Sequence, residues 1–127
     1  MYRLAAAAML GTVLFGAGAE AQGIYGGSLY AGPTQFRAVC YFYNAGTQTV
    51  ELRDPTITAP GGAALPLVVN ECGAQLLPNR SCGIAANVRT TLAYNCGTFV
   101  APANLGLRGV FELRDRSGTS LTRTTLR

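Results

Sequence analysis

Four cysteines are the residues of this chain most able to form covalent or metal bonds. Cys40, Cys72, Cys82 and Cys96 follow one another at intervals of 32, 10 and 14 residues. No pair has the C-x2-C spacing of common zinc sites, so the pattern favours two disulfides over a metal centre. Four cysteines allow three pairings, and the spacing alone leaves all three open.

Acid–base and nucleophilic catalysis lack their usual residues. The chain has no His, and all 10 of its basic residues are Arg, so the ordinary proton shuttle and the Ser–Lys pair are both missing. Two carboxylates acting on a glycosidic bond are the remaining option. The acidic residues lie mostly beside arginines or at a turn, which gives them simpler roles. We therefore expect no catalytic residue, no cofactor and no metal. The acidic residues weighed are Glu51, Asp54, Glu71, Glu112 and Asp115.

Arginines gather near the end of the chain. The final twenty residues contain five arginines and two acidic residues, a net charge of +3. Guanidinium forks match phosphate and carboxylate groups, so this segment is a candidate surface for an anionic envelope polymer, with no nucleic acid expected. The alternative is that the charges only keep an edge strand soluble. The candidate binding residues are Arg108, Arg114, Arg116 and Arg123.

Two tyrosines form a second candidate surface. Tyr41 and Tyr43 are two positions apart, so they share one face of a strand with Val39. Tyrosines combine a large contact area with a polar tip, which suits binding to sugars or to proteins. Ordinary packing between neighbouring strands is the alternative reading.

Short strands are the elements that must position these residues. Residues 35–44 alternate with a period of two, and similar segments follow at 49–58, 65–72, 83–88, 93–100, 107–114 and 119–126. Pro55 interrupts one of them and predicts a bulge or an edge position. Turn residues recur about every ten positions, which is typical of seven or more antiparallel strands in a sandwich or barrel. A short helix at 63–67 or 85–92 is the alternative for those segments.

The first twenty-one residues have the features of a secretory signal peptide. A positive start precedes a charge-free apolar stretch at 4–18, and small residues offer a cleavage site before Gln22. About 15 apolar residues are too few to span a bilayer comfortably. An uncleaved anchor is the alternative. We expect an exported chain, periplasmic or secreted, with one domain over residues 22–127 and no transmembrane segment after cleavage.

Two motifs resemble known sandwich domains. Tyr94 precedes Cys96 by two residues and Cys40 lies 56 positions before that cysteine, which resembles the tyrosine corner and intersheet disulfide of immunoglobulin-like folds. Residues 72–82 read C-x3-L-x-P-x2-S-C, which resembles bacterial secreted immunoglobulin-like domains of the ASH and choice-of-anchor type. The resemblance implies an immunoglobulin-like antiparallel β-sandwich with disulfides Cys40–Cys96 and Cys72–Cys82, and a scaffold role without catalysis.

The sequence therefore predicts an exported, non-enzymatic structural or binding module of the bacterial envelope. Its partner would be a protein or an anionic envelope polymer. Two other functions remain open. One is a fimbria-like subunit that is completed by strand exchange with a neighbour. The other is a small secreted enzyme inhibitor that presents the loop at 76–80.

Overall fold

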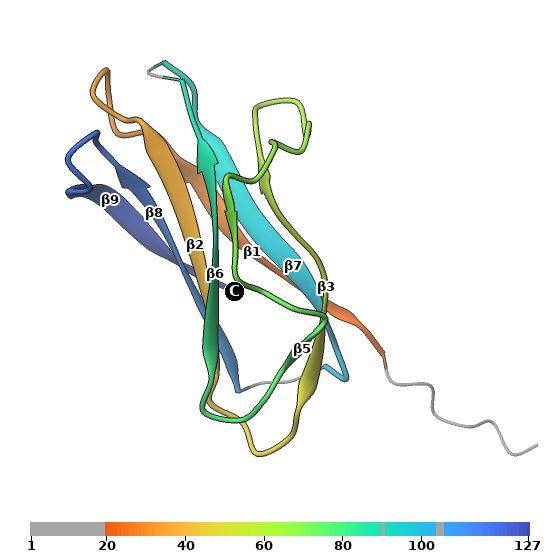
Figure 1. Ribbon diagram of the computed structural model, residues 1–127. Helices are drawn as coiled ribbons and strands as arrows, with labels where there is room; N and C mark the ends of the chain where they lie inside the picture. The colour runs from red at the N-terminus through yellow and green to blue at the C-terminus, as the bar shows by residue number, and fades with distance from the viewer. Residues whose placement is uncertain (1–19, 90, 104–105) are drawn as a thin grey trace, which may run out of the picture.

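The computed structural model describes residues 20–89, 91–103 and 106–127 (Figure 1). Most of the predicted signal peptide, residues 1–19, lies outside this range. No helix in the described part of the chain is long and apolar enough to cross a membrane. The first strand begins at Gln22, directly after the predicted cleavage site.

The described residues form nine strands and no helix, so the short helix considered at 63–67 is not formed. Six of the predicted segments agree with observed strands to within two residues at each end. The strands are β1 (Gln22–Leu29), β2 (Arg37–Asn44), β3 (Val50–Thr58), β4 (Val69–Asn70), β5 (Gln75–Leu76), β6 (Ser81–Asn87), β7 (Tyr94–Ala101), β8 (Leu107–Arg114) and β9 (Ser120–Leu126).

The strands form two antiparallel sheets that pack face to face, which confirms the predicted immunoglobulin-like sandwich. One sheet has the order β1-β7-β3-β5, and the other has the order β4-β6-β2-β8-β9. Strand β2 lies at the centre of the five-stranded sheet and pairs with β6 and β8 along its length (Figure 1). Its period-two pattern decides which side chains enter the core, because successive residues of a strand point to opposite faces.

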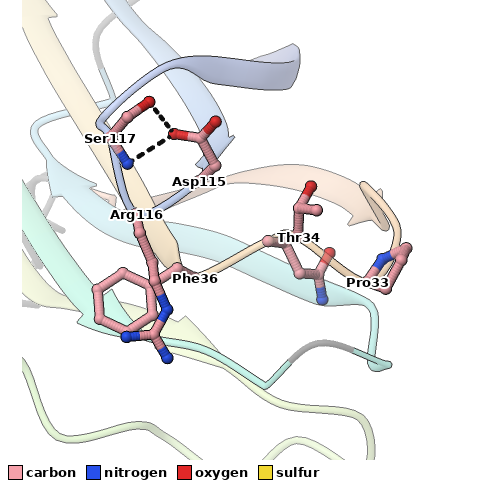
Figure 2. A pocket seen from close by; sticks show the side chains of 7 residues that line it. Pro33, Thr34, Phe36, Asp115, Arg116 and Ser117 are labelled. Atoms are coloured by element: carbon pink, nitrogen blue, oxygen red, sulfur yellow. Dashed lines mark hydrogen bonds between the residues drawn. The ribbon is translucent and has the colours of Figure 1, made fainter.

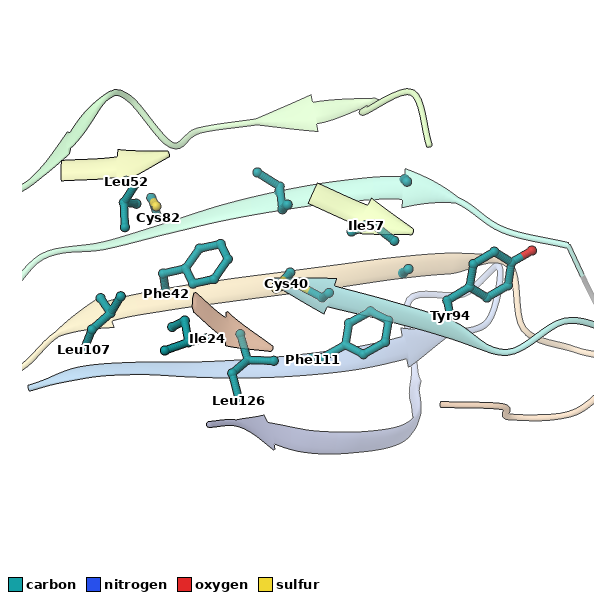
Figure 3. Packing of buried hydrophobic residues seen from close by; sticks show 14 of the residues in the cluster. Ile24, Cys40, Phe42, Leu52, Ile57, Cys82, Tyr94, Leu107, Phe111 and Leu126 are labelled. Atoms are coloured by element: carbon teal, nitrogen blue, oxygen red, sulfur yellow. A yellow bond between two sulfur atoms is a disulfide. The ribbon is translucent and has the colours of Figure 1, made fainter. Parts of the chain in front are cut away.

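The core lies between the two sheets. Ala38, Cys40 and Phe42 of β2 are fully buried, and Phe111 of β8 lies opposite Cys40 in the strand register (Figure 3). Burying a Phe or Ile side chain stabilises a fold by roughly 1.5–3 kcal/mol. The interior of this small domain is therefore held chiefly by its aromatic and branched residues. The largest fully buried apolar side chains are Tyr94, Phe42, Phe111, Ile57, Ile84, Leu113, Val50 and Val100.

Both predicted disulfides are present. Cys40 and Cys96 join β2 to β7 through the core, with 6.3 Å between their Cα atoms. Cys72 and Cys82 are joined with 5.0 Å between their Cα atoms, which ties the chain before β5 to β6. Both distances lie in the usual range for disulfides.

The tyrosine corner is also present. Tyr94 is 1 % exposed, and its hydroxyl accepts a hydrogen bond of 2.7 Å from the backbone N–H of Arg89. This contact satisfies the one polar atom of a large buried side chain. The hydrogen bond joins Arg89, which follows β6, to the first residue of β7, as the resemblance implied.

The predicted strand at 65–72 is wrong for most of its length. Only Val69 and Asn70 form a strand, and Val68 and Val69 are exposed. This segment passes from the five-stranded sheet, which contains β4, to the four-stranded sheet, which contains β5. Val68 donates a backbone hydrogen bond to Ala85 of β6, and Leu52 of β3 donates one to Ala74. A segment that changes sheets within a few residues cannot keep one face buried.

Strand β1 was not expected from the sequence, because its three glycines disfavour a strand. It pairs with β7 from Gln22 to Gly26 and buries Ile24 in the core. A side chain at Gly26 would collide with Leu126, so the glycine allows β1 to approach the end of β9. Tyr25 and Arg127 exchange two backbone hydrogen bonds there, of 3.0 and 3.1 Å.

Pro55 lies at a bulge, as its position predicted. The pairing of β3 with β7 shifts register between Arg53 and Thr56, and Asp54 has a φ of 49°. The short strand β5 pairs only with Val50 and Glu51, so the proline does not disrupt that ladder.

Candidate functional site

The outer face of the five-stranded sheet brings together the two surfaces predicted from the sequence. In the β2–β8 register Tyr43 lies opposite Arg108, and Arg37 lies opposite Arg114. Arg123 of β9 lies opposite Glu112 of β8. Directly paired residues point to the same side of a sheet. We call this surface the arginine–tyrosine face, and it consists of Arg37, Tyr41, Tyr43, Arg108, Arg114 and Arg123.

Arg114 is the best-fixed cation of this face. Its Nε and Nη2 atoms lie 2.9 and 2.8 Å from one carboxylate oxygen of Glu112. Nη2 also donates a hydrogen bond of 3.2 Å to the hydroxyl of Tyr41, whose ring centroid is 5.8 Å from the guanidinium carbon. The hydrogen bond that Arg114 donates to Glu112 raises the pKa of Arg114, so this charge persists at any physiological pH.

The two tyrosines differ in their surroundings. Tyr41 is 38 % exposed, and its ring lies over Gly83 of β6, where an added Cβ would be 3.1 Å from two ring carbons. The glycine therefore leaves room for the ring against the sheet. Tyr43 is 41 % exposed and donates a hydrogen bond of 3.3 Å to the side chain of Asn79 in the turn before β6.

Arg37 is a functional candidate that the prediction of site residues omitted. Arg37 is an even number of positions from Tyr41 and Tyr43 along β2, and this spacing places it on the same face. Its Nη2 atom lies 3.4 Å from the side-chain oxygen of Asn87. Its Nε atom is buried and has no hydrogen-bond partner among the residues described. A buried donor without a partner costs free energy, so this atom needs an acceptor.

The turn between β8 and β9 holds Arg116 at one end of the face. Asp115 accepts hydrogen bonds from the backbone and the hydroxyl of Ser117, at 2.9 and 2.6 Å, and from the backbone of Thr119 at 3.0 Å. The guanidinium carbon of Arg116 lies 4.7 Å from the ring centroid of Phe36, which is a cation–π contact. Figure 2 shows the Asp115 carboxylate and the Arg116 guanidinium on opposite sides of this turn.

Three neighbouring hollows share lining residues, and we call the three together the groove. The first, of about 160 Å³, lies beside Tyr41 and Glu71, and it shares Arg37 and Arg114 with a middle hollow of about 150 Å³. The middle hollow shares Phe36, Asp115 and Arg116 with the third, of about 400 Å³, which reaches the loop at Pro33 and Thr34 (Figure 2). Arginines therefore line the centre of the groove, and an aromatic ring lies toward each end.

Few of these cations have an acidic partner. Within residues 20–89, 91–103 and 106–127, the ion pairs are Arg114 with Glu112 and, on the opposite sheet, Arg53 with Glu51. Arg108 and Arg123 lie on the same face outside the groove, and Arg123 lines a separate hollow beside Val110. The arrangement presents guanidinium groups that can bind an external anion. In the described residues no three His, Cys, Asp or Glu side chains lie together as a metal site would require.

These features define an immunoglobulin-like β-sandwich with a cationic, tyrosine-bearing face. Comparison of the chain with protein-family models, with curated proteins and with solved structures finds no match in any of the three.

The Asp115 turn gives a prediction about pH. The hydrogen bond from the Ser117 side chain, together with backbone donors, lowers the pKa of Asp115 below its ordinary value. The contribution of this carboxylate to the turn is therefore complete above the unfolded pKa and is lost as pH falls through the folded pKa. In an NMR titration the carboxyl carbon of Asp115 should reach its midpoint at a lower pH than in an unfolded peptide of the same sequence. Ser117→Ala should raise that midpoint, and equal midpoints in protein and peptide would refute this role of the turn.

Proposed function

We propose that this protein is an exported, non-catalytic binding module of the bacterial envelope that binds an anionic polymer through its arginine–tyrosine face. The observation that carries the proposal is the meeting of four arginines and two exposed tyrosines on one sheet face, where Glu112 pairs with only one of the arginines. Guanidinium forks bind carboxylate or phosphate groups, and tyrosine rings add contact area to sugars.

Location in the periplasm or outside the cell is part of this proposal. The predicted signal peptide and the two disulfides support it, because disulfides persist in oxidising compartments. The similarity to ASH and choice-of-anchor domains stays a prediction. The two-sheet arrangement and the paired cysteines are compatible with it.

The fimbria-like alternative has less support. Strand exchange requires a place beside an edge strand that the subunit does not fill itself. Here β1 already lies along β7, and its Tyr25 also bonds to Arg127. The inhibitor alternative, with the loop at 76–80, stays a prediction as well.

Salt-dependent retention tests the proposal. The oxidised domain should bind resins that carry carboxylate or phosphate groups and should elute with increasing salt, because salt screens exposed charges. Replacing Arg114 and Arg123 of the face, and Arg116 in the turn at its end, by Ser should weaken binding by about tenfold or more, at about half a kcal/mol for each lost ion pair.

A control variant with the same loss of charge separates a site from simple cation exchange. Arg53, Arg80 and Arg89 are exposed and lie outside the arginine–tyrosine face. Replacing these three by Ser removes the same charge and should leave the elution position much closer to that of the unmodified protein. Equal shifts in the two variants, or no retention of the unmodified protein at low salt, would contradict a binding face.

A further inference from the structure

We propose that the middle hollow of the groove is a phosphate site, and that the polymer bound by this face is a phosphorylated saccharide. This inference rests on the proposed function and names its ligand class. Three arginines line the hollow, Arg37, Arg114 and Arg116. They come from two adjacent strands and from the turn that follows β8, so the fold itself brings them together.

The buried Nε atom of Arg37 is the first argument for a ligand. This atom has no hydrogen-bond partner in the described chain, while the same side chain reaches Asn87 only through Nη2. Leaving such a donor unsatisfied is unfavourable. In this side-chain position Nε is closed to solvent, so an anion in the hollow removes the penalty by drawing the Arg37 guanidinium outward to meet it.

The acidic residues nearby do not accept a hydrogen bond from the Nε atom of Arg37. One oxygen of Asp115 accepts all three hydrogen bonds of its own turn, and the carboxylate points toward Ser117, away from the Arg116 guanidinium (Figure 2). Glu112 is occupied by Arg114. Three arginines and Asp115 line the hollow, and Glu112 offsets the charge of Arg114, so the hollow keeps a net positive charge.

A phosphomonoester fits this geometry better than a carboxylate does. It has three terminal oxygens and a charge near −2, so each oxygen can accept from a different guanidinium. A carboxylate has two oxygens in one plane and a single charge. The hollow measures about 150 Å³, which is room for roughly five water molecules at about 30 Å³ each. One tetrahedral anion and its hydration can therefore be held there.

The two neighbouring hollows have the kind of walls that a sugar attached to the phosphate would contact. Tyr41 lies beside the hollow on one side, 38 % exposed and held by Arg114. On the other side the groove widens to about 400 Å³ along Phe36, Pro33 and Thr34. Partly exposed aromatic rings next to polar groups suit sugar rings, which have apolar faces and hydroxyl edges. A phosphate in the centre would place its attached sugar beside one of these aromatic walls.

The test uses the oxidised domain with three small probes and observes the arginine side chains. Inorganic phosphate, glucose 1-phosphate and glucuronate are titrated separately while the Nε–Hε signals of the arginines are followed by NMR. We expect both phosphates to shift the signals of Arg37, Arg114 and Arg116 more than those of Arg108 and Arg123. Glucose 1-phosphate should bind more tightly than inorganic phosphate, and glucuronate should bind more weakly than either.

Variants of single arginines test which side chains bind the phosphate. Arg37→Gln and Arg116→Gln should each weaken binding of glucose 1-phosphate by about tenfold, because each removes a charged hydrogen bond. Arg123→Gln removes the same charge outside the hollow and should change the affinity by less than about threefold, through long-range electrostatics alone. Arg116 is exposed in a turn, so its replacement tests the site without disturbing the core. Dispersed backbone spectra confirm that each variant is folded.

The inference is overturned if all three variants weaken binding equally, if glucuronate binds as tightly as glucose 1-phosphate, or if no probe shifts the Arg37 signal. Tighter binding of inorganic phosphate than of the sugar phosphate would overturn the saccharide assignment. Failure here is distinguishable from failure of the proposed function. In that case the face variant would still lose retention on carboxylate resins while its charge-matched control kept it.

Discussion

Replacing Cys40 and Cys96 together by Ala should lower the free energy of unfolding by about 4 kcal/mol. The cross-link restrains a loop of 56 residues, and the loop-entropy relation gives roughly 4 kcal/mol for that length at 25 °C. Small domains have total stabilities of about 5–15 kcal/mol, so this loss is large. Denaturant unfolding of the oxidised protein and the double variant measures the difference.

The second disulfide provides a control for this prediction. Cys72 and Cys82 close a loop of only 10 residues, for which the same relation gives about 3 kcal/mol. Its removal should loosen mainly the segment that crosses from β4 to β5, because the core disulfide still joins the sheets. A Cys40–Cys96 double variant that loses less than 1 kcal/mol would show that the link between β2 and β7 contributes little to the fold.

Phe111→Ala should cost about 3–5 kcal/mol, the range found for large aromatic residues in cores. Phe111 is fully buried and lies opposite Cys40 in the β2–β8 register (Figure 3). A Cβ added at Gly26 of β1 would be 3.5 Å from the Cβ of Phe111, so β1 packs closely on this residue. Its removal would leave a cavity that the cross-linked strands on either side cannot readily close. Thermal or denaturant unfolding of the oxidised variant measures the loss.

Phe99→Ala is the matched control, because it removes the same group from the outer face of the other sheet. Phe99 is 44 % exposed, and its main aromatic neighbour is Tyr25, with ring centroids 5.8 Å apart. An exposed aromatic pair contributes about 0.5–1.5 kcal/mol, so the cost should stay near 1 kcal/mol. Similar losses for the two variants would mean that the core is not centred between the sheets.

The sequence predicts the strands whose residues alternate strictly. In β2, Ala38, Cys40 and Phe42 face inward as expected, and β8 occupies the predicted residues 107–114. The turn at 115–118 forms because Asp115 can accept hydrogen bonds from the residues that follow it. In these segments the alternation of residues and the turn-forming side chain of Asp115 are enough to predict the structure.

The parts that local chemistry could not predict depend on contacts between distant segments. Strand β1 is rich in glycine, and it forms because Ile24 enters the core and Tyr25 bonds to Arg127, which is far from it in the sequence. The segment around Val68 reads as a strand, but the Cys72–Cys82 link holds it across an edge of the sandwich. Neither relation is visible in a short window of sequence.

The candidate site was predicted as two unrelated groups. Tyr41 and Tyr43 were identified on one strand, and Arg108, Arg114 and Arg123 on a hairpin far along the chain. Only the pairing of β2 with β8 shows that they share a face. Arg37 was on the same strand face as the tyrosines, but its importance depends on the turn that brings Arg116 near it.

Mapping the binding of a soluble anionic polysaccharide on the oxidised domain tests the central claim most directly. Phosphorylated dextran would be added to isotope-labelled protein, and backbone amide shifts would be followed by NMR. The account predicts changes along β2, β8, β9 and the turn at 115–118, with β1, β3 and β7 unaffected. Changes centred on β1, β3 and β7, or no change at low salt, would contradict it.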